Sequence, residues 1–214
     1  MDLFKLISGS ISRDIECWAF GGNAMMFYGY KDDTKDVDLL FAKEEDRSEF
    51  VKVIEELGFS ETSPRNIYVP EKLRDKYKPL MYSRFLARFD LFVSKIFRTT
   101  LSPKMKEEVY AVHDFTQKRR LRVNVLRKEF IVLLKAVTER DKDFEDILTI
   151  ARKEKNFDWD LLVGEAIWQH QKGDSLIILD LEKAMKELKK YVFVENKHLK
   201  QLYEAYGKRG RLYD

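Results

Sequence analysis

Residues 20–40 decide the fold of this chain, and they read FGGNAMMFYGYKDDTKDVDLL. An apolar run ends at Gly21 and Gly22, which predicts a strand followed by a tight turn. The residues after the glycines favour a short helix, and Gly29 is a good helix terminator. A glycine turn between a strand and a helix lets backbone N–H groups approach an anion closely. The stretch therefore predicts a strand, a turn suited to phosphate and a short helix.

A second strand is predicted at residues 36–41, and thirteen residues separate Gly22 from its first residue, Asp36. Asp36 and Asp38 are two residues apart in it, so both side chains point to the same face of a sheet. Two carboxylates on one face repel each other unless a cation lies between them. Mg²⁺ is the usual cation where phosphates are also bound. The spacing therefore predicts a magnesium site beside the glycine turn.

A third acidic residue, Asp90, stands alone in an apolar strand predicted at residues 87–93. Burying a carboxylate costs several kcal/mol unless something compensates its charge. A metal ion shared with the other two acids would compensate it. The alternative is a structural acid that pairs with Arg88 or Arg84.

The rest of the chain divides into a mixed half and a helical half. All four prolines lie between residues 60 and 105, and none follows residue 126. Periodicity predicts further strands at 80–85 and 109–115 and helices at 3–13, 44–57, 158–171, 175–191 and 195–206. We therefore expect an α/β (α+β) domain over residues 1–124, a mixed sheet with flanking helices, followed by an all-helical domain over residues 125–214.

The composition excludes several classes of protein. Of the 214 residues, 44% are hydrophobic, which excludes global disorder. Forty Lys and Arg against 37 Asp and Glu leave a net charge of +3, so the chain is no polycation. One Cys and three His exclude a disulfide framework and a zinc site built on two pairs of cysteines. No uncharged run approaches the ~20 apolar residues of a membrane span. The first residues lack a basic start with an apolar core, so we expect no membrane partner and a cytoplasmic location.

The first motif resembles that of the nucleotidyltransferase superfamily of the DNA polymerase beta type. That family has an apolar residue, Gly, Gly or Ser, a gap, then Asp, an apolar residue, Asp or Glu, and an apolar residue. The pattern is filled here by Phe20, Gly21, Gly22 and, after thirteen residues, Asp36, Val37, Asp38 and Leu39. The family also needs a third carboxylate on a neighbouring strand, and Asp90 supplies it.

The resemblance implies an enzyme that moves a nucleoside monophosphate from an NTP to a hydroxyl acceptor and releases pyrophosphate. The implied catalytic and metal-binding residues are Asp36, Asp38 and Asp90, which would hold two Mg²⁺ ions, with Mn²⁺ as an alternative. The implied contacts to the nucleotide come from Gly21, Gly22, Asn23, Thr34, Lys35 and Lys135.

A second motif, in the helical half, places Lys135 before Arg140, Asp143 and Asp146. It resembles the Lys and Arg-x-Lys-Asp-x-x-Asp stretch of the abortive-infection toxin-like branch, in which the Lys faces the triphosphate. That branch implies tRNA, another RNA or a protein as acceptor and an antitoxin as partner, with a small-molecule acceptor as the runner-up. The alternative is that these charged residues form salt bridges at helical spacing.

The chain departs from the family at Asn23, since many members carry Ser directly after the glycines. A serine hydroxyl there helps to hold the terminal phosphate. The departure supports an alternative function, a catalytically inactive member that binds a nucleotide or a protein partner. A third hypothesis is a structural or interaction domain that uses the fold alone.

Overall fold

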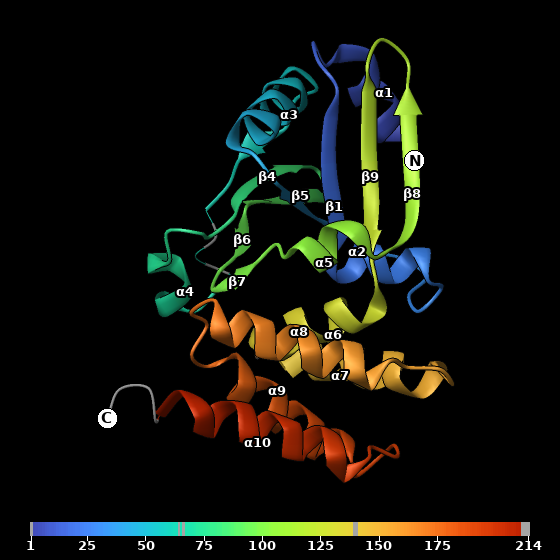
Figure 1. Cartoon of the computed structure of the whole chain (residues 1–214). Helices are drawn as coiled ribbons and strands as arrows, with labels where there is room; N and C mark the ends of the chain where they lie inside the picture. Colours follow the sequence, from blue (N-terminus) through green and yellow to red (C-terminus); the bar gives the residue numbers. More distant parts are fainter. Residues whose placement is uncertain (1, 64, 66, 139–140, 211–214) are drawn as a thin grey trace. The chain divides into compact units, whose positions relative to one another are not determined.

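The computed structural model shows two compact units, Met1–Arg127 and Lys128–Asp214 (Figure 1). The boundary lies between the last strand of the first unit and the first helix of the second. The sequence predicted this boundary after residue 124. The structure describes residues 2–63, 65, 67–138 and 141–210.

The first unit is built on one mixed sheet. Its described strands are β1 (Ile15–Phe20), β2 (Asp36–Phe41), β3 (Ser60–Glu61), β4 (Leu80–Arg84), β5 (Ala87–Val93), β6 (Lys95–Ile96), β7 (Thr99–Thr100), β8 (Val109–Thr116) and β9 (Arg120–Leu126). Along the sheet the order is β3-β4-β5-β2-β1-β9-β8, and β6 and β7 extend from β5. The pairs β1–β9 and β2–β5 are parallel, and the other pairs are antiparallel.

One face of this sheet is covered by two amphipathic helices, α1 (Asp2–Ser10) and α3 (Glu44–Glu56). The core between these helices and the sheet contains Phe50 of α3 and the odd-numbered side chains of β2 and β5, such as Leu39 and Phe89. Since successive side chains of a strand point to opposite faces, the even-numbered side chains of these strands lie on the other face.

Three further helices complete the first unit: α2 (Gly21–Phe27), α4 (Pro70–Arg74) and α5 (Pro103–Glu107). The short helix α2 follows β1 without a gap and packs against β1, β2 and β9. Pro70 and Pro103 each stand at the first turn of a helix, where the missing N–H costs no hydrogen bond.

The second unit contains helices joined by short connections, and no strand lies among its described residues. It contains α6 (Lys128–Thr138), α7 (Asp141–Lys153), α8 (Trp159–Gln171), α9 (Ile177–Leu188) and α10 (Asn196–Gly210). Its core includes Phe130, Leu162 and Leu181, which are fully buried. The predicted fold class, a mixed sheet with flanking helices followed by an all-helical half, is therefore confirmed.

The sequence periodicity located most of the longer elements, but it missed β9 and the short elements β3, β6, β7, α4 and α5. The strand β9 was not predicted, although Leu121, Val123 and Val125 alternate in it and all three are fully buried. Across the described ranges of the chain, no helix has both the length and the apolar character that a membrane crossing requires.

Candidate active site

Three acidic side chains share one face of the sheet. The strands β2 and β5 are parallel neighbours, and their register pairs Asp38 with Asp90 and Asp36 with Arg88. Leu39, between the two acids of β2, points into the core on the opposite face. The structure therefore brings the three predicted carboxylates onto adjacent strands of one surface.

The glycine turn lies directly against one of these acids. Gly21 has φ +65°, in the left-handed region that favours glycine. A Cβ atom there would lie 2.1 Å from Oδ2 of Asp38, so no other residue fits without moving the carboxylate. A Cβ atom on Gly22 would lie 2.9 Å from Oγ1 of Thr34. The two glycines therefore let Asp38 and Thr34 pack closely on the backbone of the turn.

Two polar side chains fix the beginning of β2. The backbone N–H of Asp38 donates to Oδ1 of the buried Asn23 at 3.2 Å. The backbone N–H of Asp36 donates to the hydroxyl of Thr34 at 3.3 Å. Lys35, which lies between Thr34 and Asp36 in the chain, has an exposed side chain. Asn23 and Thr34 thus hold the strand that carries the acids, and their contact with a nucleotide stays a prediction.

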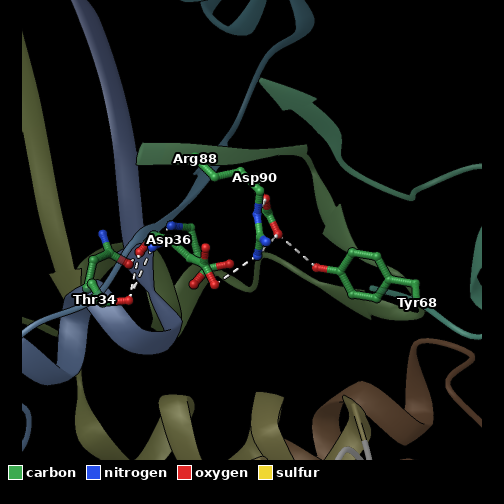
Figure 2. A network of polar contacts seen from close by, with 7 residues as sticks. Thr34, Asp36, Tyr68, Arg88 and Asp90 are labelled. Carbon is green, nitrogen blue, oxygen red and sulfur yellow. Dashed lines mark hydrogen bonds and ion pairs between the residues drawn. The ribbon is translucent and has the colours of Figure 1, made fainter. Parts of the chain in front are cut away.

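An arginine lies between two of the three carboxylates (Figure 2). The Nη2 atom of Arg88 is 2.8 Å from Oδ2 of Asp36, and its Nε donates to Oδ1 of Asp90 at 2.8 Å. The hydroxyl of Tyr68 donates to Oδ2 of Asp90 at 3.0 Å. We call these four residues the strand charge cluster. The pairing of Asp90 with Arg88, weighed as an alternative in the sequence analysis, is present, whereas the guanidinium of Arg84 lies over the ring of Phe85.

Burial differs sharply across the strand charge cluster. The Asp90 side chain is 1% exposed, whereas that of Asp36 is 40% exposed. Burial raises the pKa of Asp90, against the opposing effects of Arg88 and Tyr68. Burial works against the charge of Arg88, but the carboxylates of Asp90 and Asp36 outweigh it and raise the pKa of the guanidinium. Arg88 is therefore charged at any physiological pH.

The donor chemistry of this surface suits Mg²⁺, but Arg88 fills the space between two of the donors. Three carboxylates are hard oxygen ligands of the kind that Mg²⁺ prefers. Within the described parts of the chain, no three Asp, Glu, His or Cys side chains converge closely enough to hold a metal ion. The guanidinium bridges Asp36 and Asp90 and acts there as a stand-in cation. The surface thus binds a cation, and in this structure the cation belongs to the chain.

Lys135, predicted to face a nucleotide, lies in α6 of the second unit with a side chain that is 7% exposed. Its Nζ is 3.1 Å from Oδ1 of Asp143 and 2.6 Å from Oδ2 of Asp146, both on α7. The hydroxyl of Thr138 donates to Oδ2 of Asp143 at 2.6 Å. We call these four residues the helical charge cluster. The salt bridges weighed as an alternative are present, but they join two helices. Arg140 lies outside the described residues, and a nucleotide contact of Lys135 stays a prediction.

Sequence reasoning gave no functional role to Arg88 and did not single out Tyr68. Arg88 had a usable signal, because it stands two residues before Asp90 and strand alternation puts both on one face. Tyr68 had none, since it comes from the irregular segment between β3 and α4, twenty-two residues before Asp90.

The comparisons with known proteins give distant likeness in fold only. No protein-family model matches the chain, and no curated protein matches it either. One similar solved structure is ANT(2")-Ia in complex with adenylyl-2"-tobramycin, at 14% identity and a TM-score of 0.36, covering 91% of this chain and 88% of that one. Another is a protein from H. pylori provisionally assigned as a nucleotidyltransferase, at 14% identity and a TM-score of 0.41. The match covers 98% of this chain and 94% of that one.

Proposed function

We propose that this chain is a nucleotidyltransferase that moves a nucleoside monophosphate from an NTP to a hydroxyl acceptor. The observation that carries the proposal is the packing of the Asp38 carboxylate on the Gly21 turn, with Asp36 and Asp90 on the same face. A backbone turn without side chains beside three carboxylates combines a place for phosphates with ligands for the cations that accompany phosphates.

In this proposal the turn binds the anionic end of the nucleotide. The backbone N–H groups of Gly21 and Gly22 hold the β and γ phosphates, and the exposed ammonium of Lys35 offsets part of their charge. Thr34 and Asn23 keep the turn and β2 in register through their hydrogen bonds to the backbone of the acids. Any larger side chain in the turn would displace the groups on which the phosphates depend.

The acids supply the chemistry of the transfer. The acceptor oxygen forms a bond to the α phosphorus, the bond from that phosphorus to the β-phosphate oxygen breaks, and pyrophosphate leaves. Asp90 accepts the proton of the attacking hydroxyl. Asp36, Asp38 and Asp90 would hold Mg²⁺ or Mn²⁺, which when bound supplies charge stabilisation to the phosphates.

For the acceptor we propose a hydroxyl of RNA, such as tRNA, or of a protein, with an antitoxin as the regulatory partner. This choice follows the resemblance of the Lys135 segment to the toxin-like branch. A small-molecule hydroxyl is the alternative within the same reaction.

A second candidate function is nucleotide or protein binding without turnover. Two observations favour it: Arg88 already neutralises part of the acidic surface, and Asp90 is sealed from solvent.

Label transfer separates the two candidates. The pure protein is incubated with each NTP labelled at the α phosphate, with Mg²⁺ and with total RNA or protein extract, and both labelled acceptor and pyrophosphate are measured. We expect Asp38→Asn and Asp90→Asn to reduce transfer by about 100-fold or more. Asp114→Asn is the matched control, because Asp114 is also paired with an arginine across two strands but is exposed and lies far along the sheet, on β8.

Each outcome decides one point. Transfer that persists in either site variant would refute the assignment of the acids. Tight nucleotide binding without label on any acceptor would favour the second candidate. A protein that shows neither transfer nor an NTP-dependent thermal shift would refute both.

A further inference from the structure

The positive group of the strand charge cluster is a side chain of the protein itself, the guanidinium of Arg88. Arg88 has a planar guanidinium whose donors match carboxylates in a fixed fork, and it uses them on both Asp36 and Asp90. The guanidinium does not lose its charge within the physiological range. Two of the three carboxylates that the proposed function assigns to a divalent ion are therefore already bound to a permanent positive charge.

A divalent ion and this guanidinium compete for the same oxygen atoms. The ion needs Oδ atoms of Asp36 and Asp90 at coordination distance, and both residues now direct an Oδ at Arg88 from 2.8 Å. Two positive groups at such distances also repel each other strongly, more so on a partly buried surface than in water. The two cations cannot occupy the space between Asp36 and Asp90 together.

We infer that Arg88 leaves Asp36 and Asp90 when the divalent ion binds, and that its guanidinium then pairs with the phosphates of the nucleotide. This inference rests on the proposed function, because it takes the acids as the ion's ligands. It makes Arg88 a residue that couples the binding of the ion to the binding of the substrate.

The phosphates are the natural next partner for the displaced charge. An arginine that loses two carboxylates at a partly buried position needs another anion, and a triphosphate offers oxygen acceptors to the same fork. Arg88 lies on the face that also carries Asp36, and the turn before Asp36 packs through Thr34 on Gly22. The bound triphosphate would therefore lie next to the strand from which Arg88 projects.

The same movement opens the proposed base. Arg88 donates to both oxygens of the buried Asp90 carboxylate, and the hydroxyl of Tyr68 donates to Oδ2. When Arg88 moves, the Tyr68 hydroxyl still holds Oδ2 and keeps the carboxylate in its orientation. Asp90 thus loses its contacts with Arg88 only when the ion and the nucleotide have arrived, and its oxygen atoms then become available to the ion and the acceptor.

Direct measurement of Mn²⁺ binding tests the inference without relying on catalysis. Free Mn²⁺ is quantified by electron paramagnetic resonance in titrations of the full chain, of Arg88→Met and of Arg122→Met. The control fits because Arg122 makes a two-bond pair with Asp114 across neighbouring strands, so both variants lose one arginine from a carboxylate pair. We expect Arg88→Met to bind Mn²⁺ at least about tenfold more tightly than wild type, and Arg122→Met to match wild type.

A non-hydrolysable NTP analogue completes the test. In the wild-type chain the analogue should tighten Mn²⁺ binding toward the affinity of Arg88→Met, and in that variant the tightening should be much smaller. Unchanged or weaker Mn²⁺ binding by Arg88→Met overturns the inference. If this variant does not fold, Arg88→Lys replaces it, because one ammonium cannot bridge both carboxylates in the same way. Its Mn²⁺ affinity should then lie above that of wild type, and an unchanged value overturns the inference equally.

The two proposals fail in different ways. If wild type transfers label but Arg88→Met shows no gain in Mn²⁺ affinity, only the role of Arg88 is refuted. If no variant binds Mn²⁺ even with the analogue, and no transfer occurs, both proposals are refuted.

Discussion

The two charge clusters of this molecule have the same arrangement of charges but differ in how far their carboxylates are exposed to solvent. Each holds one basic side chain between two carboxylates, and in each a hydroxyl donates to one of the carboxylates, from Tyr68 in the strand charge cluster and from Thr138 in the helical charge cluster. In the strand charge cluster, however, one carboxylate is 40% exposed, while the more exposed carboxylate of the helical charge cluster reaches only 12%. Charged motifs that look equally functional in a sequence can therefore differ in whether any ligand can reach them.

Their neighbours differ as well. The strand charge cluster has a third carboxylate, Asp38, on the same face and the glycine turn beside it. The carboxylates of the helical charge cluster are both bound to Lys135 and lie between two helices. A third carboxylate next to a turn suited to phosphate is an arrangement that suits the binding of a ligand. A buried ion pair between packed helices suits a structural role.

The variant with the largest expected effect is Lys135→Met, which tests whether the helical charge cluster stabilises the fold. Removal of the ammonium breaks the buried ion pairs that Lys135 makes with Asp143 and Asp146, which should cost about 3–5 kcal/mol of unfolding free energy. Urea unfolding followed by circular dichroism measures the loss. Lys142→Met is the control, because Lys142 is exposed on the same helix as the two acids, and it should change stability little.

A rescue variant decides why Lys135 matters. If the helical charge cluster is structural, replacing Asp143 and Asp146 by Leu together with Lys135→Met should recover much of the lost stability, because well-packed apolar residues often replace a buried ion pair. If the rescued protein folds but has lost NTP binding, Lys135 contacts the nucleotide after all and the comparison is wrong.

Gly21→Ala has the next largest expected effect, and it tests the strand charge cluster's surroundings. The added Cβ would lie 2.1 Å from Oδ2 of Asp38, so the carboxylate must move. A displacement of this size should lower transfer by about 100-fold, equivalent to about 2.7 kcal/mol of transition-state stabilisation.

Gly29→Ala provides the matched control. Gly29 has φ +70°, close to the φ +65° of Gly21, but no atom lies within 4 Å of the Cβ that it would gain. Both variants therefore carry similar backbone strain, and only Gly21→Ala carries the clash. If the two lose activity equally, strain alone explains the loss and the packing of Asp38 on the turn is irrelevant to transfer.

The sequence predicted the part of this site that depends on local rules. Alternation along a strand put Asp36 and Asp38 on one face, and a lone acid in an apolar strand singled out Asp90. The pairing of β2 with β5, and hence the meeting of these acids, depends on contacts between distant segments that periodicity does not encode. Such pairing was available only through the family resemblance.

The same limit explains what was missed. The contact of Tyr68 with Asp90 joins an irregular segment to a strand, and no periodic pattern marks it. The ion pairs of Lys135 cross between helices, eight and eleven residues apart in the chain, so the helical spacing rule for salt bridges did not describe them.

Tyr68→Phe and Thr138→Val compare the hydroxyls that donate to the carboxylates of the two clusters, and smaller effects are expected from them. Each substitution removes one hydrogen bond to a carboxylate and should cost about 1.5 kcal/mol. Only Tyr68→Phe should also change the rate of transfer and its pH profile, because Tyr68 orients the proposed base. Tyr82→Phe is a further control, because the hydroxyl of Tyr82 donates to Oε1 of Glu55 at 3.0 Å and makes no contact with the three aspartates. Burial, together with this contact, raises the pKa of Tyr82 to about 12. A change in transfer by Thr138→Val, or none by Tyr68→Phe, would contradict the assignment.

The smallest expected effect concerns the core face behind the strand charge cluster. Cys17 of β1 is fully buried there, and burial raises the pKa of its thiol far above the usual value. Because the thiolate is the reactive form, and because its fraction falls as the pKa rises, a thiol reagent at pH 8 should leave the folded protein unlabelled and label it fully in urea. Arg88→Met should not change this protection if its effects stay on the acidic face. Labelling of native Arg88→Met at the rate of an exposed thiol would show that removing the guanidinium opens the whole sheet, and Arg88 would then be a structural residue.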